Sequence, residues 1–339
     1  MKEDNQKIVA IWLLICCVMI FCMVIIGGLT RLTDSGLSMT NWHPIHGAIP
    51  PLDDKSWLEE FESYRKSPEY NKINYGMTVD EFKEIFWLEF IHRLFGRITG
   101  IVFLIPLIYF IFTKKVTGKI CLKLTGIFLL GGLQGLIGWW MVKSGLKDSP
   151  HVSPVWLAFH MGSACFILGL TLSMALGILF NKQKVEDKKT KNISNIAFCA
   201  VFLQIILGAL VAGLDAGLIY NSFPDMNGKM IPDDIWISSL AFYNFFENPA
   251  LVQFNHRIFA YITTAIIIYL WWNSKKHKSL YIISNIMLIT IIAQVAIGIL
   301  TLIHSVPIYL ASIHQAVAVL LFAMTLGISR LLCSQKMKS

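Results

Sequence analysis

Residues 86–112 read FWLEFIHRLFGRITGIVFLIPLIYFIF, and this run is apolar almost throughout. Near its beginning it carries four ionisable side chains, Glu89, His92, Arg93 and Arg97. About 20 apolar residues in a helix are enough to cross the hydrocarbon core of a bilayer. Ionisable groups are costly inside a membrane and usually serve a ligand, a partner or a proton path. The stretch therefore predicts a membrane helix with a functional site near one end.

Comparable apolar runs recur along the whole chain. Of its 339 residues, 55% are hydrophobic and only 15% are charged, which is too little charge for a soluble protein of this length. We therefore predict an all-α membrane protein with eight transmembrane helices. Their expected ranges are 8–29, 86–112, 120–142, 153–180, 194–214, 249–272, 280–303 and 307–333.

The basic residues indicate how the chain is oriented. Sixteen of the 29 Lys and Arg residues fall in the N-terminal tail, in the segments near 113–119, 181–193 and 273–279, and at the C-terminal end. Only nine fall in the opposite loops, and the longest of these, 30–85, is also rich in Asp and Glu. The positive-inside rule then predicts that both termini are cytoplasmic. The excess positive charge is explained by topology, and nothing in the sequence suggests binding of nucleic acid.

The cysteines exclude one kind of haem attachment. All seven lie in or at the ends of the expected spans, and no CxxCH motif occurs. Covalent c-type haem attachment and a disulfide in the outer loops are therefore not expected.

The two halves of the chain align with each other. The matched segments are 21–37 with 202–218, 89–99 with 253–263, 133–140 with 293–300, and 156–164 with 309–317. Since each half contributes four helices, an even number, both halves have the same orientation in the membrane. We predict two pseudo-symmetric four-helix bundles, an N-terminal one in 1–180 and a C-terminal one in 194–339, joined by a charged cytoplasmic linker at 181–193.

Four histidines recur at matched positions. The alignment places His92 over His256, and His160 near His314 after a one-residue shift. A lone intramembrane histidine is usually a packing residue, but duplication in two pairs favours ligation. We predict that His92 pairs with His160, and His256 with His314, around iron porphyrins held between facing helices. Zinc fits less well, because no Cys or carboxylate ligands cluster with these residues.

One position breaks the symmetry. Glu89 lies three residues before His92 and so shares its helix face, whereas the corresponding residue before His256 is Gln253. A carboxylate beside a bound macrocycle can accept or deliver protons. The alternative is a carboxylate near a helix N-terminus, favoured there by the helix dipole. The asymmetry predicts chemistry in the first half and a supporting cofactor in the second.

Three arginines follow these histidines closely. Arg93, Arg97 and Arg257 lie in early turns of the same expected helices. Haem propionates are suitable bidentate partners for arginine, and we consider them possible contacts. Phospholipid or loop carboxylates are equally good alternatives.

Several glycines lie in the expected helices 8–29 and 120–142, which carry none of the four histidines. Small residues allow neighbouring membrane helices to approach closely. We expect plain helix packing at the glycines of the first half: Gly27, Gly28, Gly131, Gly132, Gly135 and Gly138.

Taken with the four histidines, several longer stretches resemble the haem A synthase family, in the branch found in Gram-negative bacteria and mitochondria. Besides EFIHRLFGR and its counterpart NHRIF, they are SGLSMTNWHPIHGAIPPL (35–52), SPEYNKINYGM (67–77) and AGLDAGLIYNSFPDMNG (212–228). The resemblance runs through nearly the whole chain. It implies an oxidoreductase of a bacterial inner membrane that converts haem O to haem A. A porphyrin methyl group would be hydroxylated twice, and the gem-diol would then lose water to give a formyl group.

The resemblance also implies roles for individual residues. Haem b would be the cofactor, with its iron held by His256 and His314, and the iron of the substrate haem would lie near His92 and His160. Glu89 matches the glutamate considered essential in the family. Haem O synthase and cytochrome oxidase assembly factors are the implied partners, and a homo-oligomer is possible. Other members carry a cysteine pair in outer loops, which this chain lacks, so a loop-thiol role does not transfer.

Two other classes of function use the same features. A dihaem b-type electron carrier needs the same four histidines and leaves the porphyrins unchanged. A transporter is compatible with a parallel repeat, but no pair of Gly/Pro-broken helices marks a central binding site. Analysis of the bound pigments discriminates between these possibilities.

Overall fold

The computed structural model describes residues 3–40, 46–146, 150–180 and 185–333. Among these residues, eight helices are long and apolar enough to cross a membrane, which confirms the expected number and the all-α class. They are α1 (Glu3–Leu32), α4 (Val79–Phe112), α5 (Gly118–Gly145), α6 (Pro154–Leu179), α7 (Lys188–Gly213), α9 (Pro249–Ser274), α10 (Tyr281–Ile303) and α11 (Ile308–Leu331).

Helix α4 begins earlier than its apolar run. Thr78 and Glu81 form a capping box, in which Thr78 N–H donates to Glu81 Oε2 at 2.7 Å and Glu81 N–H donates to Thr78 Oγ1 at 3.3 Å. Two donors at the helix end are thereby satisfied, so the helix starts in the polar loop. The expected start at residue 86 was wrong. Glu89 and His92 consequently lie in the interior of α4, which removes the interpretation of Glu89 as a helix N-terminal carboxylate.

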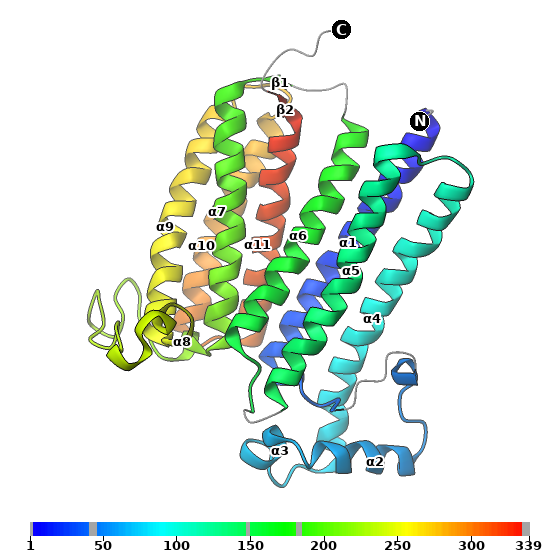
Figure 1. Ribbon diagram of the computed structural model, residues 1–339. Helices are drawn as coiled ribbons and strands as arrows, with labels where there is room; N and C mark the ends of the chain where they lie inside the picture. The colour runs from blue at the N-terminus through cyan, green and yellow to red at the C-terminus, as the bar shows by residue number, and fades with distance from the viewer. Residues whose placement is uncertain (1–2, 41–45, 147–149, 181–184, 334–339) are drawn as a thin grey trace. The chain divides into compact units, whose positions relative to one another are not determined.

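The long loop before α4 has its own folded core. It contains η1 (His46–Ala48), α2 (Asp54–Tyr64) and α3 (Pro68–Lys72). Helices α2 and α3 lie beside the beginning of α4 (Figure 1), and aromatic residues of the three helices pack together in one cluster. The buried members of this cluster are Met39, Trp57, Phe61, Tyr64, Tyr70, Phe82, Phe86 and Phe90. The loop is therefore attached to the helix that carries Glu89 and His92.

Contacts divide the chain into two compact units, one of Cys22–His160 and one of Met1–Phe21 with Met161–Ser339. In the second unit, α7 packs against α9 and α11, and α10 packs against the same two helices (Figure 1). These four helices form a bundle. The short elements η2 (Ala216–Leu218), η3 (Ser238–Tyr243) and α8 (Asn244–Glu247) lie between α7 and α9 in the chain. The division into two symmetric bundles at residues 180 and 194 stays a prediction.

Part of the expected linker has regular structure. Residues 181–184 lie outside the described residues, but β1 (Val185–Glu186) pairs in parallel with β2 (Leu332–Cys333). Asp187 then caps α7 by accepting from Thr190 N–H at 2.9 Å. Burial opposes the charge on Asp187, but hydrogen bonds from Thr190, His277 and Lys276 outweigh it and hold the pKa below its ordinary value.

The first helix of each half ends in the same backbone conformation. Asp34 follows α1 with φ 48°, and Asp215 follows α7 with φ 49°. Each donates its N–H to the carbonyl three residues earlier, at 3.3 Å and 3.4 Å respectively. Left-handed backbone is uncommon outside glycine, although Asp is among the residues that tolerate it. The shared turn supports the alignment that placed Asp34 over Asp215.

Candidate functional site

Each of the four histidines lies against a glycine of the transmembrane helix that precedes its own. A methyl group placed on each glycine would lie close to the imidazole Cε1 atom. The distances are 3.0 Å for Gly27 and His92, 2.9 Å for Gly138 and His160, 3.1 Å for Gly208 and His256, and 2.7 Å for Gly298 and His314. Any residue larger than glycine would push the ring away. Gly27 and Gly138 therefore allow the close helix contact that we expected, and the side chain that each accommodates is a histidine of the facing helix.

The histidines of each expected pair belong to the same compact unit, His92 with His160 and His256 with His314. Among the residues that the structure describes, no group of three or more His, Cys, Asp and Glu could hold a bare metal ion. Two imidazoles would be a suitable pair of protein donors for a porphyrin iron. The glycine contacts and this donor set fit haem.

Three of the histidines also contact a glutamine on the glycine-bearing helix. Gln134 Nε2 lies 3.1 Å from His160 Nδ1, and Gln204 Nε2 lies 3.0 Å from His256 Nδ1. Gln294 Nε2 lies 3.4 Å from His314 Nε2. Our sequence interpretation missed these residues, although the repeat alignment places Gln134 over Gln294 and Met23 over Gln204.

Glu89 is buried on α4 with three donors around its carboxylate. Ser38 Oγ and Met39 N–H each donate to Oε2 at 2.7 Å, and Arg93 pairs with Oε1 at 2.5 Å. The side chain is 3% exposed. Two of these donors belong to the loop that follows α1, so Glu89 joins that loop to α4 one turn before His92.

Gln253 makes the corresponding contacts to its loop, but it donates hydrogen bonds where Glu89 accepts them. Its amide donates to the carbonyl oxygens of Ala216 at 2.7 Å and Tyr220 at 3.2 Å, in the loop after α7. Its Oε1 accepts from Arg257 at 3.1 Å. An amide can donate to carbonyl groups, whereas a carboxylate can only accept. Each half thus uses the side chain that suits its loop.

Two of the three arginines also contact loop backbone. Arg93 donates to Met39 O at 3.1 Å. Arg257 donates to the carbonyl oxygens of Ser222 at 3.0 Å and Asp225 at 2.7 Å. Arg97 lies one turn beyond Arg93 on α4. Contact of these arginines with propionates stays a prediction.

A second buried carboxylate, Glu69 on α3, lies in the folded loop. It is 2% exposed and accepts from Tyr64 Oη at 3.0 Å, and Tyr64 Oη in turn accepts from Asn74 at 2.7 Å. Burial, reinforced by the negative charges of Glu89 and Asp34, raises the pKa of Glu69 to about 8, although the Tyr64 bond and Arg31 act the other way. Our sequence interpretation missed this residue, because nothing in its local pattern marks it as buried.

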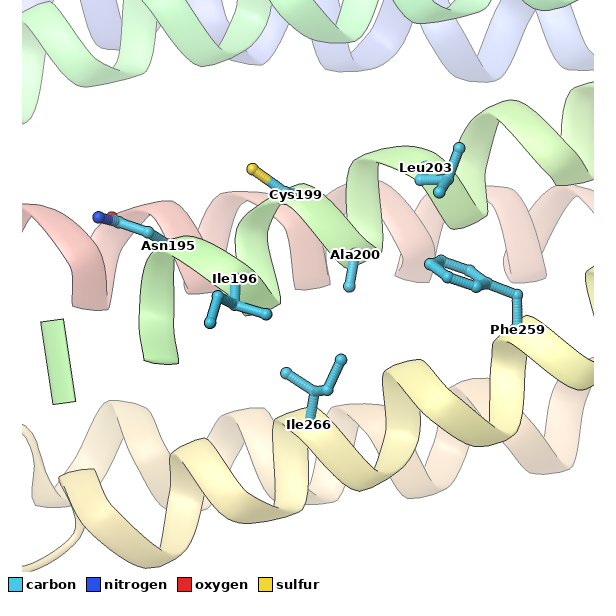
Figure 2. Close-up of a pocket in the computed structure, with 7 residues that line it drawn as sticks. All are labelled: Asn195, Ile196, Cys199, Ala200, Leu203, Phe259 and Ile266. Carbon is cyan, nitrogen blue, oxygen red and sulfur yellow. The ribbon is translucent and has the colours of Figure 1, made fainter. Parts of the chain in front are cut away.

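A groove of about 410 Å³ lies between α7 and α9. Figure 2 shows Asn195, Cys199 and Leu203 on α7, and Phe259 and Ile266 on α9. The groove is lined mainly by apolar side chains and by none of the four histidines. It therefore contributes no ligand or acid–base group to the histidine sites.

The chain is similar to known proteins over nearly its whole length. The family model described as cytochrome oxidase assembly protein (COX15-CtaA) matches residues 10–326. The heme A synthase of Nitrosospira multiformis is 44% identical over 97% of this chain and 94% of its own length. Those of Nitrosomonas eutropha and Rickettsia bellii are 42% and 43% identical, over 96% and 95% of this chain and 94% and 97% of their own lengths. The chain, a multi-pass membrane protein, belongs to the cytochrome oxidase assembly protein family that includes the heme A synthases.

Proposed function

We propose that this protein is a haem A synthase, an oxidoreductase that converts haem O to haem A. Identity of 42–44% with heme A synthases over nearly complete chains carries the proposal. The reaction is a four-electron oxidation in which one porphyrin methyl group is hydroxylated twice, with an external oxidant taking up two electrons at each step, and the resulting gem-diol loses water to leave the formyl group.

The four histidines divide between substrate and cofactor in this proposal. His92 and His160 hold the substrate haem, and His256 and His314 hold a resident haem b. When bound, haem b supplies one-electron redox chemistry. The glycine beside each histidine supports ligation by all four, because it keeps the imidazole close to the neighbouring helix and limits the directions in which the ring can point.

Glu89 is the residue that we assign to proton transfer. Its Oε2 atom is held by Ser38 and Met39, and its Oε1 atom faces Arg93, so the carboxylate has one fixed orientation. A fixed acceptor one turn before His92 can take up or return a proton at the substrate side of that histidine. Gln253 cannot do so, which assigns the chemistry to the first half.

The charge distribution and the family support a location for these sites. We place the protein in a bacterial inner membrane with both termini in the cytoplasm, so that the histidine-bearing ends of the helices face outward. Haem O synthase, as the source of the substrate, and cytochrome oxidase assembly factors, as recipients of the product, are the partners that we propose. A homo-oligomer is compatible with the chain.

Pigment analysis tests the proposal directly. The protein is expressed in cells that make haem O but lack their own haem A synthase, and the extracted haems are separated chromatographically. We expect haem A to appear only when the protein is present. Accumulation of haem O with two unchanged b haems in the purified protein would instead support a dihaem electron carrier.

A further inference from the structure

The helix that faces each histidine carries a repeated pair of residues, and one member of the series differs. In three cases a glutamine precedes the ring-contacting glycine by four residues, one helical turn. The pairs are Gln134 with Gly138, Gln204 with Gly208, and Gln294 with Gly298. On α1 the residue at this place before Gly27 is Met23, and its methyl group lies 3.5 Å from where a Cβ on Gly96 of α4 would be. Met23 thus faces α4 one turn from His92.

A glutamine amide can orient an imidazole in a way that methionine cannot. It has a donor and an acceptor at one site, so by turning it can bond either a bare or a protonated ring nitrogen. Gln204 Nε2 also donates to the His256 carbonyl at 3.0 Å, and Gln134 Nε2 to that of His160 at 2.9 Å, which ties each amide to its histidine. The thioether of Met23 is only a weak acceptor.

The histidine opposite Met23 has no glutamine beside it. His92 Nδ1 is buried and has no hydrogen-bond partner among the described residues; the same is true of His314 Nδ1, but the other ring nitrogen of His314 lies 3.4 Å from Gln294 Nε2. Partners of metal-bound histidines fix the ring orientation, and losing one usually weakens metal affinity by 10–100-fold. An imidazole without such a partner is easier to displace.

We propose that the three glutamines are positioning residues for the histidines they contact, and that Met23 leaves His92 as the exchangeable ligand. The inference rests on the proposed function, because a substrate haem must come and go whereas a resident haem stays. The proposal also distinguishes the two histidines of the first site, because Gln134 orients His160 and no glutamine orients His92. Both histidines of the second site have a glutamine.

A reciprocal exchange of side chains tests the proposal. Purified wild type, Met23→Gln and Gln204→Met are mixed with excess apomyoglobin as a haem acceptor, and the transfer of haem is followed by absorbance. Extraction of the haem remaining at each time shows which pigment is lost in each phase. Ile205→Leu is the matched control on α7. The reduction potential and low-spin spectrum of the slowly lost haem are recorded in parallel.

We expect Gln204→Met to accelerate loss of haem b by about 10–100-fold, with a shifted potential, and Met23→Gln to slow loss of the substrate haem. Ile205→Leu should change neither rate. If both exchanges leave their transfer rates at the wild-type value, the proposal is wrong. Met23→Gln adds a hydrogen bond and removes none, so this variant should still fold and test the proposal if Gln204→Met does not accumulate. The rate of haem transfer does not depend on turnover. A protein that binds two haems without making haem A would therefore refute the proposed function, while its transfer rates would still test the role of the glutamines.

Discussion

Buried Glu89 and partly buried Arg93 form an ion pair one turn apart on α4, with Glu89 Oε1 2.5 Å from the Arg93 guanidinium. Glu89→Gln keeps the size of the side chain but removes its charge and its use as a base. We expect haem to be retained and turnover to fall by roughly 10²–10⁴-fold, the usual contribution of acid–base catalysis. Parallel measurement of bound haem and haem A formation checks this. Turnover close to that of wild type would remove Glu89 from the reaction.

The reciprocal variant, Gln253→Glu, should fail for a different reason. Its carboxylate would face the carbonyl oxygens of Ala216 and Tyr220, to which Gln253 now donates. Leaving buried polar groups without partners costs about 1–3 kcal/mol. We expect a lower thermal midpoint and less bound haem b, with no second site of oxidation. A variant as stable as wild type would show that the loop after α7 adapts.

The four glycines should tolerate alanine to different degrees. A methyl group would meet the ring Cε1 at 2.7 Å in Gly298→Ala and at 2.9 Å in Gly138→Ala, but at 3.1 Å in Gly208→Ala. We therefore expect haem loss to be greatest for Gly298→Ala and least for Gly208→Ala. Gly131→Ala is the control, since no atom outside its own helix lies within 4 Å of the added carbon. Pigment content per protein ranks the series, and equal loss in all of them would contradict the steric explanation.

Glu69 predicts a pH dependence of the folded loop. Burial raises its pKa from 4.5 to about 8, so the folded state favours the protonated form. The loop should be most stable below pH 4.5 and lose that stability as the pH rises through about 8. Glu69→Gln keeps a side chain that can accept from Tyr64 and should abolish this loss. Proteolysis of residues 54–72 at pH 6 and pH 9 measures the difference, and identical pH profiles for the two proteins would exclude Glu69 as its cause.

Asp187, at the start of α7, predicts a pH dependence of opposite sign. Burial works against its charge, yet hydrogen bonds from Thr190 and His277 keep its pKa below the ordinary 3.8. The stabilisation that charged Asp187 contributes to the folded state is present above pH 3.8 and is lost as the pH falls below that value. Asp187→Asn should preserve the cap of α7, whereas Asp187→Ala should lower the free energy of unfolding by about 1 kcal/mol more. Thermal midpoints at neutral pH compare them, and equal midpoints for the two variants would show that the cap contributes little.

The sequence was sufficient for the features that depend on hydrophobicity over many residues. The eight spans are of this kind, because membrane crossing requires long apolar segments whose existence does not depend on their neighbours. The expected boundary at residue 86 failed, because a capping box of two polar side chains, Thr78 and Glu81, set the helix start. That signature was present in the sequence, but hydropathy does not detect it.

Some site residues could be predicted from the sequence, and others required the structure. The family resemblance and the repeat led to the histidines and to Glu89. The contacts of Gln134, Gln204 and Gln294 were missed, because a glutamine in a membrane helix shows its partner only when the facing helix is known. The repeat alignment could have revealed them, because three of the four residues at this place are glutamine and only Met23 differs. Glu69 has no counterpart of this kind, since its burial arises from tertiary packing of α3.

The length of α4 has a consequence for the depth of Glu89. The helix has 34 residues, and at about 1.5 Å per residue the part from Glu89 to Phe112 spans about 35 Å. This part alone is enough to cross a hydrocarbon layer of about 30 Å. Glu89 can then remain at the boundary of that layer next to the folded loop, where inserting a charged pair is least costly. Protons would reach the carboxylate from the adjacent water without crossing the bilayer interior.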